Sequence, residues 1–158
     1  MVTADHLLVV SRRADHVRSG PGLWGSSVNE GLSRHIVSAG RNREELSLEP
    51  QEYTLTMLAF VLDVERRRWS AHFIAYLAGL TGQALRSRIT RGVADRWEHQ
   101  SIEYVPFHPA DVVRHLLRPD RIRRWAPVTP AQFHLAVVHT HGRTAVERAE
   151  AQAIRRLR

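Results

Sequence analysis

The sequence predicts an α+β protein in which helices cover a mixed sheet. Short apolar runs with β-branched residues recur in the first two thirds of the chain and are typical of strands. Amphipathic segments that begin at prolines fill the last third and are typical of helices. With 158 residues, of which 43% are hydrophobic, the chain has the size and composition of a single globular domain.

The first third of the chain predicts two strands and a short acidic helix. Residues 6–13 (HLLVVSRR) have an apolar, β-branched centre, and residues 24–28 form a second, shorter run. The Ser-Gly-Pro-Gly stretch at 19–22 predicts a loop between them. Residues 41–46 predict a short helix, which Glu49-Pro50 brings to a stop.

An antiparallel hairpin is the clearest strand prediction. Residues 53–63 (YTLTMLAFVLD) and 69–78 (WSAHFIAYLA) are long apolar runs with a charged tetrad between them. Because the first run is apolar along much of its length, we expect it at the centre of the sheet with both faces covered. Residues 101–107 alternate and end near a proline, which predicts an edge strand.

Helical spacing of apolar residues predicts four further helices. Residues 85–95 carry one narrow apolar stripe. Pro109 stands where the first residue of the next helix is expected. Thr129, which a proline follows, predicts the N-cap of a third helix that a glycine ends. Residues 144–157 predict the last helix, with an apolar face that ends at Leu157.

Composition restricts the partners and the cellular setting. The formal net charge of +7 indicates an anionic partner such as a nucleotide, a nucleic acid or an acidic surface. All 23 basic residues are arginine, which indicates a coding bias. The use of arginine instead of lysine is therefore no evidence for bidentate phosphate contacts. The chain has no cysteine, so disulfides and thiolate metal sites are excluded. Without a membrane-length apolar run or a signal-peptide pattern, we expect a cytoplasmic protein with no membrane partner.

Two adjacent carboxylates, Glu44 and Glu45, lie near the end of the helix predicted at 41–46. Adjacent acids do not share a helix face, but a turn at the helix end can bring both onto one hard cation. Proteins often hold Mg²⁺ against a phosphate-bearing ligand with two carboxylates and few other protein ligands. The alternative is a solvated surface pair, which is the usual place for acidic side chains.

Three pieces of sequence stand in a recognisable order: Arg12-Arg13 leading to Pro21-Gly22-Leu23-Trp24-Gly25, Glu30-Gly31 before Arg43-Glu44-Glu45-Leu46-Ser47-Leu48, and Asp95-Arg96-Trp97-Glu98 before a strand. In these pieces the chain resembles the Nudix hydrolase family. The resemblance covers residues 5–117. The resemblance implies a single Nudix-like domain, an α/β/α sandwich around a central mixed sheet, with residues 119–158 as a helical C-terminal extension.

The family motif is Gly, five residues, Glu, seven residues, then Arg-Glu-apolar-any-Glu-Glu-any-Gly-apolar. When the adjacent acids are aligned with its Glu-Glu pair, Leu48 takes the final apolar position and Ser47 replaces the glycine. The motif arginine and its neighbouring glutamate then fall on Gly40 and Arg41. The second half of the motif is therefore partly kept, and the first half fits only with a small deletion.

The resemblance implies roles for particular residues. Glu30, Glu44 and Glu45 would be ligands of Mg²⁺ or Mn²⁺, and Glu45 would thereby be catalytic. The family often adds an acidic residue from a later loop, and Glu98 is the candidate, as ligand or general base. The candidates for substrate contacts are arginines for the phosphates and a tryptophan for stacking: Arg12, Arg13, Arg18, Arg43 and Trp24.

These roles predict a Mg²⁺-dependent hydrolase of a nucleoside diphosphate linked to another moiety. The missing motif arginine and glutamate leave open a second prediction, a nucleotide-binding or regulatory module that leaves its ligand intact. A basic nucleic-acid-binding protein is the third alternative and predicts affinity that falls steeply with salt. The ten histidines lack the spacing of a zinc-binding helix, and no serine stands in a Gly-x-Ser-x-Gly elbow, so both chemistries are disfavoured.

Overall fold

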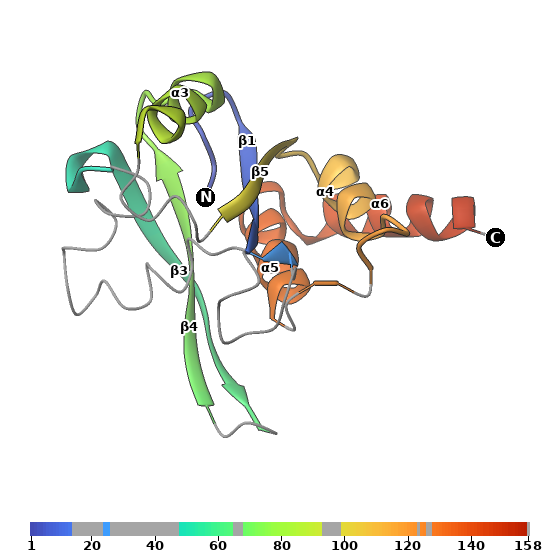
Figure 1. Cartoon of the computed structure of the whole chain (residues 1–158). Coiled ribbons are helices and arrows are strands. Elements are labelled where there is room, and N and C mark those ends of the chain that lie inside the picture. Colours follow the sequence, from blue (N-terminus) through green and yellow to red (C-terminus); the bar gives the residue numbers. More distant parts are fainter. Residues whose placement is uncertain are drawn as a thin grey trace.

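The computed structural model describes residues 1–13, 24–25, 48–64, 68–92, 99–122, 124–125 and 128–157 (Figure 1). Its strands are β1 (Leu7–Arg13), β2 (Trp24–Gly25), β3 (Tyr53–Asp63), β4 (Arg68–Leu77) and β5 (His99–Pro106). Its helices are the short 3-10 helix η1 (Pro50–Glu52) and the α-helices α3 (Gly82–Gly92), α4 (Pro109–Leu116), α5 (Thr129–His141) and α6 (Arg143–Leu157). This combination confirms the α+β class. The helix predicted at 41–46 lies outside the described residues.

The strands form two antiparallel groups, with β1 between β2 and β5 in one and the hairpin β3–β4 in the other. The N-terminal residues join these groups. Val2 forms an antiparallel bridge with Leu8 of β1 and a parallel bridge with Tyr76 of β4. Its backbone N–H donates to the carbonyl of Ala75 at 2.8 Å, and its carbonyl accepts from Leu77 N–H at 2.9 Å. Among the described residues, the parallel pairing is therefore limited to the bridge between Val2, at the start of the chain, and Tyr76 of β4.

Side chains of β1 alternate between two hydrophobic clusters. Leu8 and Val10 belong to the α4–α6 cluster, and both are buried almost completely. This cluster gathers residues of the strands and of three helices: Val2, Ile74, Val105, Phe107, Val112, Trp125, Phe133, Ala136, Val137 and Val146. Val9 belongs to the α3 cluster, together with Leu48 and with Leu85 of α3. Because successive strand residues face opposite sides, helices cover both faces of β1.

The four helices predicted after residue 80 are confirmed in type, with three corrections at their ends. Helix α3 begins at Gly82, three residues before the predicted start at Leu85. Pro109 is the first residue of α4, as its fixed φ and missing N–H favour. In α5 the N-cap is Val128 rather than Thr129, which is the first helical residue and is buried. Leu157 is 67% exposed, so the prediction that it belongs to the buried face of α6 is wrong. Among the described residues, no helix combines the length and apolar character that crossing a bilayer requires.

The position predicted for β3 is wrong. Its bounds match the prediction, but among the described strands it pairs with β4 alone. Met57 is 60% exposed and Phe60 is 63% exposed, which contradicts the prediction that both faces of β3 are covered. In Figure 1 the far end of the hairpin extends away from the helices. The apolar content of a strand indicates a preference for burial, whereas its place in the sheet depends on distant residues, and here β1 takes the central place.

Candidate functional site

Two of the predicted substrate-binding positions lie opposite each other in the sheet. Arg12 of β1 pairs with Trp24 of β2 across one edge of β1. Across the other edge, Arg13 pairs with His99, the first residue of β5, which directly follows Glu98 in the sequence. Three predicted site positions and the start of β5 therefore converge at one end of the β2–β1–β5 sheet.

A β-bulge lies at the same place. The register between β1 and β5 shifts between Arg12 and Arg13, which interrupts an otherwise continuous ladder. Bulges bend the strand, increase its twist and redirect side chains, and they are frequent beside active sites. The irregular point of β1 thus coincides with the arginine pair predicted to contact phosphates.

The remaining predicted site residues lie outside the described residues. These are the metal-ligating and catalytic acids and two arginines: Arg18, Glu30, Arg43, Glu44, Glu45 and Glu98. The structure therefore gives the backbone position of three predicted site residues, Arg12, Arg13 and Trp24.

The chain is anchored in the core just beyond the predicted metal ligands. Leu48, which the resemblance aligns with the final apolar position of the Nudix motif, is only 4% exposed. It packs in the α3 cluster with Val9 of β1 and Leu85 of α3. Burying a leucine side chain contributes about 1.5–3 kcal/mol to stability. Leu48 thus fixes the chain against β1, the strand whose far end carries Arg12 and Arg13.

A second anchor follows immediately. Glu49 donates its backbone N–H to Oε2 of Glu52 at 2.8 Å. The Glu52 carboxylate accepts two hydrogen bonds from the Arg88 guanidinium of α3, at 2.7 and 2.8 Å. These charge-assisted bonds hold the pKa of Glu52 below its usual range. The turn at η1 is therefore fastened to α3 by a bidentate pair.

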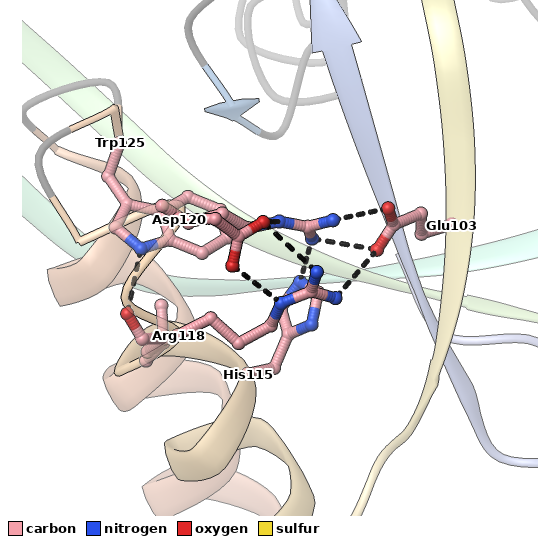
Figure 2. Close-up of polar contacts among 7 residues, drawn as sticks. Glu103, His115, Arg118, Asp120 and Trp125 are labelled. Atoms are coloured by element: carbon pink, nitrogen blue, oxygen red, sulfur yellow. Dashed lines mark hydrogen bonds and ion pairs between the residues drawn. The ribbon is translucent and has the colours of Figure 1, made fainter.

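A buried polar network joins β5 to the turn after α4 (Figure 2). The Arg121 guanidinium, whose side chain is 3% exposed, donates to both carboxylate oxygens of Glu103. Its Nη1 also lies 3.1 Å from Nε2 of His115. Arg118 donates from Nε and Nη2 to the Asp120 carboxylate, at 3.0 Å each, near the solvent. The network thus fixes the strand that starts after Glu98.

The electrostatics of this network favour a structural role. The Arg121 hydrogen bonds hold the pKa of Glu103 below its usual range, so its carboxylate is ionised at neutral pH and poorly suited to act as an acid. Burial, assisted by the Arg121 charge, lowers the pKa of His115 to about 4. Neutral His115 can therefore accept the Arg121 hydrogen bond, and its ring packs edge-on against Trp125 at 5.6 Å between centroids.

No sequence pattern indicated this network, since Glu103 and Arg121 are separated by a helix and a turn. Within the described ranges, no group of three histidine, aspartate or glutamate side chains has the geometry to hold a metal ion. The predicted metal ligands lie outside those ranges. In comparisons with known proteins, no family model and no curated protein matches this chain.

Proposed function

We propose that this chain is a Nudix-like, Mg²⁺-dependent hydrolase that cleaves a nucleoside diphosphate linked to another moiety. The observation that carries the proposal is the convergence of Arg12, Arg13 and Trp24 with the start of β5 at one end of the sheet. Cationic groups for a diphosphate and a flat ring for a base are the two contacts that such a substrate requires. The helices on both faces of β1 support a Nudix-like sandwich as the finer description of the fold.

The chemistry of the acidic segment fits a hard divalent cation. Glu30, Glu44 and Glu45 offer carboxylate oxygens, the ligands that Mg²⁺ prefers. The burial of Leu48 supports this assignment because it fixes the chain shortly after Glu45, in a cluster that includes β1. Bound Mg²⁺ would offset charge on the phosphate oxygens and lower the pKa of the attacking water.

The chain's own residues would then divide the remaining work. Arg12 and Arg13 would donate hydrogen bonds to the diphosphate and hold it at the bulged end of β1. Trp24, across from Arg12, would stack on the base. Glu98 would accept the proton of the attacking water as general base. The network around Glu103 would keep β5, and with it the approach to Glu98, in place.

A second candidate function is favoured by one observation in the sequence. Gly40 and Arg41 stand where the motif has its arginine and glutamate, so part of the metal cage is missing. Such a chain would bind a nucleotide without cleaving it and pass the signal to a partner. Binding that is indifferent to Mg²⁺ and leaves the ligand intact would favour this candidate.

The test is turnover of a panel of nucleotide sugars and ADP-ribose with Mg²⁺ present. We expect phosphate-ester products from the unaltered chain and none from Glu44→Gln or Glu45→Gln. Glu147→Gln, an equal change of charge on the exposed face of α6, is the control and should leave turnover unchanged. Calorimetry with the same panel separates the candidates, and a folded protein with neither turnover nor binding would contradict both.

A further inference from the structure

A hollow lies where α6 covers α4 incompletely. Its volume is about 280 Å³, and α4, the turn after it and the last turns of α6 enclose it. In Figure 1, α6 continues past α4 towards the C-terminus. The hollow is lined mainly by small or aliphatic side chains: Ala110, Leu117, Pro119, Ala149, Ala153 and Leu157. Leu157 lies in the wall of this open hollow, which accounts for its exposure.

Three arginines and no carboxylate share the lining with these apolar groups: Arg114, Arg118 and Arg156. Arg114 is paired with Asp111 at 2.7 Å, and Arg118 is paired with Asp120 at 3.0 Å. Within the part of the chain that the structure describes, no ion pair joins Arg156 to an acidic side chain. The lining therefore carries positive charge that its neighbours offset only in part.

The C-terminal part of the sequence is positive as well. Residues 107–158 contain ten arginines and four acidic residues, a formal excess of six in a chain whose total is +7. Basic residues in the last turn of α6 also complement the helix dipole. The helix dipole accounts for the charge of these residues, but it does not account for the apolar hollow that Arg156 lines. A positive region focuses anions onto a concave surface, which raises their local concentration.

We propose that this hollow binds a small anion that carries an apolar body, such as an alkyl phosphate or an alkyl carboxylate. The anionic group lies among Arg114, Arg118 and Arg156, and the apolar body packs against Leu117, Leu157 and the alanines. A bare inorganic anion would leave the apolar wall unused. Nucleic acid is less suited, because no aromatic side chain lines the hollow for base stacking. The volume lies near the lower limit of small-molecule sites, about 300–1,000 Å³.

This inference does not depend on the proposed hydrolase activity, since none of the lining residues belongs to the predicted catalytic set. Helix α6 supplies two matched pairs of variants for the test. Ala153→Phe fills the hollow, whereas Ala151→Phe adds the same ring at an exposed position outside the lining. Arg156→Gln and Arg155→Gln each remove one charge, but only Arg156 lines the hollow.

The measurement is isothermal titration of octyl phosphate, below its micelle concentration, into the full chain. We expect one saturable site, with about tenfold weaker binding for Ala153→Phe and for Arg156→Gln. Ala151→Phe and Arg155→Gln should bind as the unaltered chain does. Circular dichroism and the thermal midpoint establish that each variant is folded, and an unfolded variant is replaced by Leu117→Gln or Arg114→Gln.

Further ligands define the chemistry of the site. Octyltrimethylammonium and inorganic phosphate should each bind much more weakly than octyl phosphate, since each lacks one of the two recognised features. Phosphatidylglycerol vesicles distinguish the source of the ligand. Vesicle binding that Ala153→Phe and Arg156→Gln weaken, and that Ala151→Phe and Arg155→Gln leave unchanged, assigns a bilayer lipid, and the absence of such binding assigns a free anion. Equal losses within either matched pair, equal affinity for the ammonium compound, or no saturable octyl phosphate binding would overturn the proposal.

Discussion

Arg121, in the turn after α4, and Glu103, on β5, form a buried bidentate ion pair in which the arginine side chain is 3% exposed. The pair joins segments that are 18 residues apart in the sequence. Taking two charges out of water is unfavourable, so such a pair stabilises the fold only while both members are present.

Replacing Glu103 by alanine should lower the free energy of unfolding by about 2–4 kcal/mol, because Arg121 would remain buried with its main counter-charge removed. Part of the carboxylate is exposed, which keeps the expected loss below that of a fully buried pair. Urea denaturation measures the change. The control is Glu147→Ala, which breaks the exposed pair with Arg143 and should change stability by less than about 0.5 kcal/mol.

A double variant tests the cause. Glu103→Leu combined with Arg121→Met removes both charges and should recover most of the stability that Glu103→Ala loses. If the double variant is less stable than the single one, packing of the side chains rather than the unpaired charge determines the effect.

Acidification should destabilise the protein through His115. Its pKa is about 4 in the folded chain and near 6.5 when unfolded, so between these values the unfolded state binds a proton that the folded state does not. The free energy of unfolding therefore falls as pH decreases from 6.5 towards 4, by about 3 kcal/mol from this residue at the lower limit. Urea denaturation at a series of pH values measures the slope.

His115→Gln should flatten this dependence, since glutamine keeps an acceptor for the Arg121 hydrogen bond but does not titrate. The groups that face His115 are Arg121, Glu103, Arg118 and Asp120. Buried His72, whose pKa burial also lowers, contributes in the same direction and should leave a residual slope. An unchanged slope in the variant would show that His115 is not the titrating group.

Removal of the Glu52 carboxylate should loosen the turn that follows the acidic segment. Glu52→Ala deletes the acceptor of the Glu49 backbone N–H and the partner of Arg88. Hydrogen exchange of the Glu49 amide should become about tenfold faster, the equivalent of one lost hydrogen bond of roughly 1.4 kcal/mol. Amides of α6 should exchange at an unchanged rate, and a general increase would indicate global rather than local opening.

Gly142 should resist substitution for a conformational reason. It is the C-cap of α5 with a φ of 81°, a region that residues with a Cβ rarely adopt. Apart from its own chain neighbours, no atom of the described residues lies within 4 Å of the place where a Cβ would stand, so packing does not oppose the change. Gly142→Ala should lower the free energy of unfolding by about 1 kcal/mol. A thermal midpoint equal to that of the unaltered protein would contradict this reasoning.

Local patterns predicted much of the secondary structure. The bounds of β3 match the predicted run 53–63, because the apolar and β-branched content of a run acts within a few residues. Pro109 predicted the start of α4 for an equally local reason, its fixed φ. Of the predicted site, the structure describes the pairing of Arg12 with Trp24, whereas Glu44, Glu45 and Glu98 lie outside the described residues.

The sequence by itself determined which segments become strands and helices, since propensity, capping and apolar spacing depend on near neighbours. The tertiary structure alone decided their placement: β1 rather than β3 at the centre, Val2 between β1 and β4, and Arg121 beside Glu103. These relationships join residues far apart in the chain, and they are selected by the total burial and pairing of the whole fold. No local pattern carries that information, because the sequence pattern of a strand, or the identity of a charged residue, does not depend on which distant residue becomes its partner.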